Sequence, residues 1–190
     1  MAFYKDERLA LFIDGANLYS AARAVGLEID FRKLLKEFQQ RGRLVRASYY
    51  TTIVESDEYS PIRPLVDWLA YNGFNVVKKP AREFTDREGR KRFRGNMDIE
   101  LATDMLEAAG WSDHIVLFSG NGDFRRLVEA VKAKGVRVSV VSTMNASPPM
   151  ISDELRREAD TFIELVDLGE LIARPRRDTG ADALPGQDDD

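Results

Sequence analysis

Short apolar runs alternate with helical patterns along most of this chain, and this alternation is what most constrains its fold. Strands that alternate with helices form a mainly parallel sheet with helices on both faces, because parallel strands need a crossover connection. We therefore expect an α/β fold. The patterns predict strands at residues 9–13, 44–50, 74–77, 115–118 and 136–141, and helices at residues 30–40, 60–72, 96–110 and 123–134.

The length of 190 residues suits one domain with its own core. We expect this domain to cover residues 1–172. The last residues, 173–190, are rich in proline, glycine and charge, and they contain too few apolar side chains to offset chain entropy. They are predicted to form a disordered, charged tail.

The counts of a few residue types exclude whole classes of function. The chain has no cysteine and one histidine, so disulfides, zinc–thiolate sites, cysteine nucleophiles and mechanisms that need two histidines are ruled out. The histidine, His114, precedes a strand and is expected to be a surface or packing residue. No apolar run is long enough to span a membrane, and the charged N-terminus is unlike a signal peptide. We expect a cytoplasmic protein that does not contact membranes.

Polar side chains follow the first and the fourth predicted strands. Asp14 and Asn17 come after the first, and Ser119, Asn121 and Asp123 come after the fourth. In open α/β sheets, ligands bind outside the carboxyl ends of the strands, where the strand order reverses. If these two strands are neighbours, their polar residues meet at one edge of the sheet.

The helix that begins at residue 96 adds another carboxylate, Asp98. It shares a helical face with apolar residues, including Leu101 and Met105, so its charge must be paired, hydrogen-bonded or bound to a metal. Several Asp carboxylates repel one another, and a hard divalent cation such as Mg²⁺ or Mn²⁺ relieves that repulsion. The pattern predicts a metal site formed by Asp14, Asp98, Asn121 and Asp123.

Simpler structural roles compete with this interpretation. Asp123 is also well placed to cap a helix, and Asp98 to interact with a helix dipole. Asp104 shares a helical face with Glu100 and Glu107, which is typical of a face exposed to solvent.

Residues 78–94 carry a strong local positive charge. They hold eight basic and three acidic residues, and the turn-like sequence at 86–89 lies between Phe84 and Phe93. This predicts a protruding hairpin whose basic groups bind phosphates and whose aromatic rings stack on unpaired bases. The alternative is a solvated loop with its phenylalanines packed on the body. The candidate RNA-binding residues are Lys78, Lys79, Arg82, Arg87, Arg90, Lys91, Arg92 and Arg94.

Three motifs in this order resemble those of the NYN domain family, a branch of the PIN-like nucleases, and its bacterial LabA-like group in particular. They are FIDGANL at residues 12–18, GNMDIELATDM at residues 95–105 and SGNGDF at residues 119–124. The resemblance extends over residues 8–168. It implies a PIN-like three-layer sandwich and hydrolysis of RNA with Mg²⁺ or Mn²⁺, leaving 5′-phosphates.

By the same resemblance, Asp14, Asp98 and Asp123 are acidic site residues, and Asn17 orients a ligand or substrate. Asp104 and Ser119 are secondary candidates. The chain departs from the family where Asn121 replaces the usual Asp. An amide offers a carbonyl oxygen but no negative charge, and it cannot act as a base. We therefore expect weaker metal binding and lower activity than in relatives.

These observations predict a ribonuclease that cuts single-stranded or unpaired RNA, weakened by Asn121, and a homodimer is possible. One alternative is an RNA-binding or regulatory module of the same fold that does not cleave. A third hypothesis is a phosphatase or nucleotide hydrolase that uses Asp14 as its nucleophile, which requires an aspartyl-phosphate.

Overall fold

The computed structural model describes residues 3–54, 62–85, 88 and 90–175. Its centre is a six-stranded sheet with the order β3-β2-β1-β6-β7-β8, in which all neighbouring strands are parallel. The first strand lies in the middle of the sheet. The chain moves outward to β3, returns to place β6 beside β1, and then moves outward on the other side. The strands are β1 (Arg8–Asp14), β2 (Arg43–Ile53), β3 (Asn75–Pro80), β6 (His114–Phe118), β7 (Arg137–Ser142) and β8 (Thr161–Glu164).

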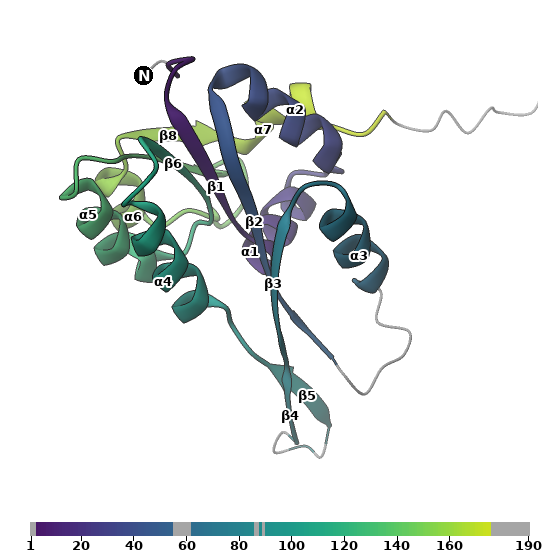
Figure 1. Ribbon diagram of the computed structural model, residues 1–190. Coiled ribbons are helices and arrows are strands. Elements are labelled where there is room, and N and C mark those ends of the chain that lie inside the picture. The colour runs from purple at the N-terminus through teal and green to yellow at the C-terminus, as the bar shows by residue number, and fades with distance from the viewer. Residues whose placement is uncertain (1–2, 55–61, 86–87, 89, 176–190) are drawn as a thin grey trace, which may run out of the picture.

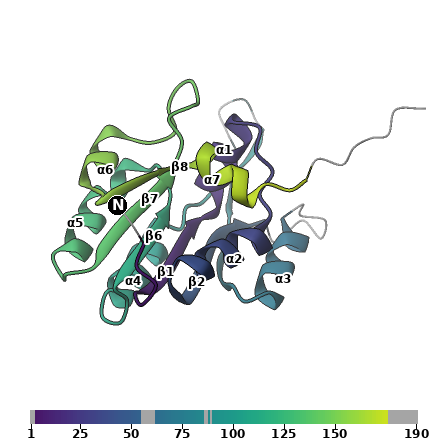
Figure 2. The same cartoon turned by 90° about the horizontal axis from the view of Figure 1, so that it is seen from above.

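Helices cover both faces of the sheet and complete a three-layer sandwich (Figures 1 and 2). One layer contains α4 (Asp98–Ala108), α5 (Arg125–Lys132) and α6 (Asp153–Glu158), with the short helix η1 (Gly122–Phe124) leading into α5. The other contains α1 (Gly15–Ala24), α2 (Phe31–Arg41), α3 (Arg63–Tyr71) and α7 (Leu165–Ile172).

The central strands are buried because each has a helical layer on both sides. Every residue of β6 is buried, and the five residues before Asp14 in β1 are at most 2% exposed. Near-continuous apolar runs of this kind are typical of strands in covered parallel sheets. The predicted α/β fold is confirmed, with its strands and helices shifted slightly at their ends.

The helix α1 was not predicted, because the sequence Asp14-Gly15 after an apolar run also fits a turn. In the structure Asp14 is the N-cap of α1, and its carboxylate accepts a hydrogen bond from the backbone N–H of Asn17. Glycine is needed at position 15 because a Cβ there would lie 2.6 Å from the ring of Tyr49. The strand thus passes directly into a helix, and Asp14 lies at the junction.

The predicted hairpin is present, as the antiparallel pair β4 (Arg82–Thr85) and β5 (Lys91–Arg94). It forms a separate two-stranded sheet, and Figure 1 shows it projecting from the body beyond β3. Lys78 and Lys79 belong to β3 instead. Arg87 lies outside the described residues, as do the side chains of Lys91, Arg92 and Arg94.

Ordered contacts continue past residue 172. Ala173 forms an isolated bridge with Ile29, and the backbone N–H of Arg174 donates to the carbonyl oxygen of Glu28. Of the predicted tail, residues 176–190 lie outside the described residues. Among the helices that the structure describes, none is long and apolar enough to cross a membrane.

Candidate functional site

A cavity of about 480 Å³ lies at the carboxyl ends of β1, β2 and β6. The first and fourth predicted strands, β1 and β6, are indeed neighbours, and the strand order reverses between them. The cavity therefore lies at the switch point, where open α/β sheets bind their ligands. We call it the acidic cavity, and its polar lining includes Asp14, Asn17, Asn96, Asp98, Asn121 and Asp123.

Asp14 is held in place from two sides. One carboxylate oxygen accepts from the N–H of Asn17, and the other accepts from the hydroxyl of Ser119 at 3.0 Å. Burial raises the pKa of Asp14, although these hydrogen bonds act in the opposite direction. Burial thus destabilises the charged form of a carboxylate whose position is fixed. A cation bound beside Asp14 would stabilise that charge.

Asn17 and Ser119 connect α1 to the loop that follows β6. The side-chain oxygen of Asn17 accepts from the backbone N–H of Gly120 at 2.8 Å, and Ser119 accepts from the N–H of Asn121 at 3.2 Å. Ser119 is buried and is not among the residues lining the cavity. Its contacts indicate that it positions Asp14 and the loop.

Asp98 occupies the first turn of α4 and is half-buried. Asn96 donates to its carboxylate at 2.8 Å. Burial raises the pKa of Asp98, and the negative charges of Asp14 and Asp123 raise it further, while Lys79 lowers it. The three carboxylates line the same cavity, close enough for their charges to affect one another.

Asn121, not Asp123, caps the turn after β6. Its side-chain oxygen accepts from the backbone N–H of Asp123 at 3.1 Å, as the N-cap of η1. Asp123 therefore does not fill the capping role that was the alternative to a metal ligand, and the residue is exposed at the cavity. An Asp at position 121 offers the same acceptor oxygen, so the turn itself does not require an amide.

Asp104 does not lie on a solvent-exposed face. The hydroxyl of Tyr50 donates to its carboxylate at 2.8 Å, and Asp104 is half-buried. Tyr50 is buried and lines the acidic cavity, whereas Asp104 lies behind it. Burial and the Asp104 charge raise the pKa of Tyr50, so this phenol stays protonated. No sequence pattern indicated Tyr50, because its pairing with Asp104 depends on packing between β2 and α4.

The donor set of the acidic cavity suits a hard cation, since it consists of carboxylate and amide oxygens. Among the residues that the structure describes, no three acidic or histidine side chains are grouped tightly enough to hold a metal ion directly. Mg²⁺ keeps several of its waters and binds through only one or two carboxylates. Burial and then the charges of Asp14 and Asp123 raise the pKa of Asp98, with Lys79 acting in the opposite direction, so a cation would stabilise its charged form. The residues therefore fit a hydrated divalent cation.

A second cavity of about 1030 Å³ runs along the hairpin. It is lined by Lys79, Arg82 and Phe84, and it shares Gly95 and Asn96 with the acidic cavity. The two cavities are thus adjacent, as the sequence position of the hairpin suggested. Phe84 is 45% exposed, which contradicts the alternative in which this phenylalanine packs on the body.

The candidate RNA-binding residues differ in whether an acidic side chain pairs with them. The ammonium of Lys79 contacts both carboxylate oxygens of Glu100, at 2.8 and 2.9 Å. Arg90 pairs with Glu88. Lys78 and Arg82 are exposed. Lys79 is thus partly neutralised at the junction of the two cavities, and Arg82 adds an exposed positive charge on the hairpin.

The sequence pattern of the NYN domain family matches residues 8–167 of this chain. This chain belongs to the NYN domain family. It is 38% identical over 181 residues to the "Low amplitude and bright protein LabA" of Synechococcus elongatus, covering 93% of both chains. A crystal structure of a protein of unknown function from Vibrio parahaemolyticus is 26% identical and has a TM-score of 0.67, with 87% of this chain and 96% of that one covered.

Family membership narrows the function without fixing its chemistry. NYN domains are PIN-like domains of the nuclease type, so a nuclease-type or RNA-associated role follows. The matched region includes the acidic cavity and the hairpin, so the residues described above are those available for that role.

Proposed function

We propose that this NYN domain is a metal-dependent ribonuclease that cuts single-stranded or unpaired RNA at the acidic cavity. The observation that carries the proposal is that Asp14, Asp98 and Asp123 line one cavity at the switch point of the sheet. The pKa of Asp98 is raised in part by the charges of the other two. Clusters of repelling carboxylates lower stability, so their presence at a switch point favours a functional role.

In this proposal Asp14, Asp98, Asp123 and the amide oxygen of Asn121 would hold a hydrated Mg²⁺ or Mn²⁺, some of them through the waters of the ion rather than directly. When bound, such an ion supplies an activated water and stabilises the leaving oxygen of a phosphodiester. Ser119 and Asn17 keep Asp14 and the loop after β6 in place. Tyr50 stays protonated, and its bond to Asp104 keeps a neutral wall beside the cavity.

The hairpin cavity would bind the RNA that leads into the site. Arg82 provides a cationic group for phosphates, and the exposed ring of Phe84 provides a stacking surface for an unpaired base. The ammonium of Lys79 is held near Asp98 by Glu100, so a phosphate that approaches the carboxylates meets one fixed positive charge. As this substrate is handled inside the cell and the chain lacks cysteine, we place the protein in the cytoplasm.

A second candidate function is an RNA-binding or regulatory module that does not cleave. Asn121 favours it, because the amide removes one negative charge from the proposed ligand set. The described residues also contain no group of three acidic or histidine side chains that could hold a metal ion directly, which favours the binding module as well. The two functions differ in one measurable respect, the appearance of a cut product.

The test is cleavage of end-labelled single-stranded RNA with Mn²⁺ or Mg²⁺. Three proteins are compared: the chain itself, Asn121→Asp, and Asn121→Asp combined with Asp98→Asn. We expect Asn121→Asp to cut about tenfold faster than the chain, the scale of one restored charged contact. The double variant should cut about 100-fold or more slowly than Asn121→Asp. Retention of RNA on a filter without a cut product in any of the three would overturn the nuclease and support the binding module.

A further inference from the structure

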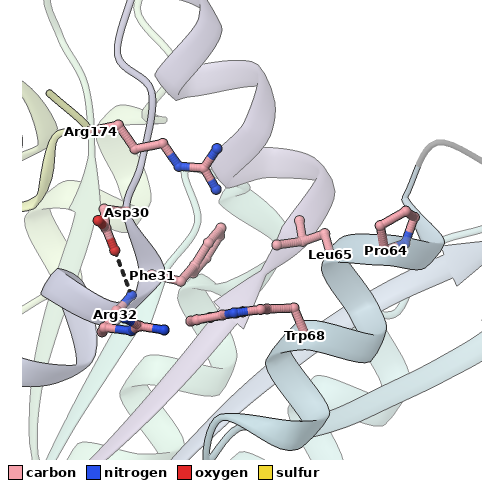
Figure 3. Close-up of a pocket in the computed structure, with 7 residues that line it drawn as sticks. All are labelled: Asp30, Phe31, Arg32, Pro64, Leu65, Trp68 and Arg174. Carbon is pink, nitrogen blue, oxygen red and sulfur yellow. Dashed lines mark hydrogen bonds between the residues drawn. The ribbon is translucent and has the colours of Figure 1, made fainter. Parts of the chain in front are cut away.

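A separate cavity lies on the other helical layer, between α2, α3 and the segment that follows α7. It measures about 510 Å³, and its walls combine the apolar side chains of Phe31, Leu65 and Trp68 with the guanidinium groups of Arg32 and Arg174. Figure 3 shows Phe31 and Leu65 on one side of the Trp68 ring, with Arg174 beyond Phe31. The cavity shares no residue with the acidic cavity.

This cavity continues into a second one along α1. The second measures about 630 Å³, and both are lined by Phe31, Leu65 and Arg174. We call the pair the aromatic groove. Volumes of this size are typical of sites for small organic ligands, which combine apolar walls with a few polar groups.

The walls of the aromatic groove are held by packing. The ring of Phe31 makes edge contacts with the rings of Tyr49 and Phe74, with centroids 5.7 and 6.0 Å apart. The guanidinium of Arg32 lies 5.7 Å from the centroid of the Trp68 ring, in a cation–π contact. The aromatic surfaces are therefore largely fixed before any ligand binds.

Arg174 is also placed by specific contacts, although it lies beyond the last helix. Its backbone N–H donates to the carbonyl oxygen of Glu28 at 2.9 Å. The neighbouring residue, Ala173, forms a β-bridge with Ile29. The carbonyl oxygen of Ala173 accepts a hydrogen bond from the ammonium of Lys33 at 2.8 Å. The segment is thus tied to the start of α2, which brings Arg174 to the groove.

The lining of the groove is net positive, since Arg23, Arg32 and Arg174 stand against Glu28 and Asp30. Within the described ranges, neither Arg32 nor Arg174 forms an ion pair with a carboxylate. Asp30 also lines the cavity, but its Oδ1 accepts from the backbone N–H groups of Arg32 and Lys33 as the cap of α2. Two guanidinium groups therefore remain available for an anion.

We propose that the aromatic groove binds a 5′-mononucleotide. The planar base would stack against the aromatic walls formed by Phe31 and Trp68, and the phosphate would bind to Arg32 and Arg174. A guanidinium fork matches the oxygens of a phosphate group, and a planar ring suits a site with aromatic walls. The inference does not depend on the nuclease activity, because it uses different residues on a different face.

The experiment uses Trp68 as its own reporter. The chain has two tryptophans, and Trp111→Phe leaves Trp68 as the only one. In this variant, with EDTA present to remove metal-bound nucleotide at the acidic cavity, AMP is titrated against tryptophan fluorescence. We expect saturable quenching by AMP, and an affinity about tenfold weaker for adenosine and for inorganic phosphate, since each lacks one half of the ligand.

Two further variants separate this site from a non-specific effect. Arg174→Gln should weaken AMP binding about tenfold, the scale of one lost charge-assisted hydrogen bond. The matched control is Arg126→Gln on α5, whose side chain is 74% exposed and pairs with Glu129, and it should bind AMP unchanged. Equal affinity for AMP with and without Arg174→Gln, or no saturation by millimolar AMP, would overturn the proposal.

Other occupants give different results and would also overturn it. If the groove instead holds a second copy of the chain, Arg174→Gln changes the molecular mass measured by light scattering while AMP leaves fluorescence unaltered. If it holds an RNA strand, Arg174→Gln reduces retention of single-stranded RNA, and AMP does not compete.

Discussion

Both ends of the parallel sheet carry acidic side chains, but the two ends differ in whether these side chains have basic partners. At the amino end, Arg8 binds Asp113 through its backbone N–H and two guanidinium nitrogens, at 2.7 to 2.9 Å. Arg137 binds Glu7 at 2.6 and 2.9 Å. At the carboxyl end, Asp14 and Asp98 have no basic partner in hydrogen-bond contact among the described residues.

The pKa values record this difference. Arg8 lowers the pKa of Asp113 to about 2, whereas burial raises the pKa values of Asp14 and Asp98. A lowered pKa means that folding stabilises the charged carboxylate, and a raised one means that folding destabilises it. The amino end therefore contributes to stability, and the carboxyl end holds unfavourable charge that a ligand can relieve.

The largest expected effect is on catalysis at the carboxyl end. In the Asn121→Asp background, Asp98→Asn should lower the rate of RNA cleavage about 100-fold or more, the usual cost of losing a charged catalytic contact. The same change should leave the unfolding free energy equal or higher, because it removes a charge that Asp14 and Asp123 repel. Rates come from gel assays and stability from urea denaturation.

The matched control is Asp67→Asn on α3, an exposed residue in the helical layer on the opposite face of the sheet from Asp98. It should alter neither rate nor stability. A large loss of stability in Asp98→Asn would contradict the comparison, since Asp98 would then be a structural residue like those at the amino end.

The next effect concerns the loop packing that shapes the acidic cavity. A Cβ at Gly120 would lie 1.7 Å from the backbone oxygen of Met150, so the loop after β7 would have to move. We expect Gly120→Ala to lower the unfolding free energy by about 2–3 kcal/mol, the scale of overpacking in a filled site. In Gly110→Ala the nearest atom is Glu107 O at 3.3 Å, so denaturant curves should show a smaller change.

Sequence patterns predicted the fold well where burial is continuous or periodic. The apolar runs of β1, β6 and β7 are continuous because helical layers cover both faces of these strands, and α2 is amphipathic because it packs only one side on the sheet. The four-residue strand β8 was not predicted, because all its residues are half-buried and so give no alternation. The helix α1 was missed because Asp14 serves both as strand end and as helix cap.

The candidate site was predictable only in part. The meeting of Asp14 with Asp123 follows from the pairing of β1 with β6, which a switch-point argument anticipates. Contacts set by tertiary packing could not be predicted from spacing. Tyr50 meets Asp104 from 54 residues away, and Arg174 reaches the aromatic groove only because α7 packs against α2.

His114, the one histidine of the sequence, lies at the amino end of the sheet, at the start of β6. Its titration can therefore be followed without overlap from another histidine. His114 is 2% exposed; its Nδ1 lies 3.1 Å from a nitrogen of Arg137, so its Nε2–H donates to Ser139. Burial and the Arg137 charge lower its pKa to about 4. Its contribution to stability is therefore complete above the ordinary pKa of 6.5 and is lost as the pH falls through 4. The imidazole C–H signals in NMR should titrate near pH 4, and a midpoint near 6.5 would show that the ring is not buried in this way.

The smallest expected effect separates the two ends by the sign of their pH dependence. Asp113→Asn should lower the unfolding free energy by about 0.5–1 kcal/mol at neutral pH, because the pair with Arg8 is half-exposed and screened by solvent. Because the pKa of Asp113 lies near 2, its contribution to stability is present above the ordinary pKa of 3.8 and is lost as the pH falls toward 2.

For Asp98 the sign of the pH dependence is reversed, since a raised pKa gives stability that is present below pH 3.8 and lost as the pH rises. Urea denaturation across pH 2–6 should therefore show Asp113→Asn with a flatter acid limb than the chain, and Asp98→Asn with a smaller decline as the carboxylates ionise. If both variants shifted the curve in the same direction, the two ends of the sheet would not differ in the way their charges are compensated.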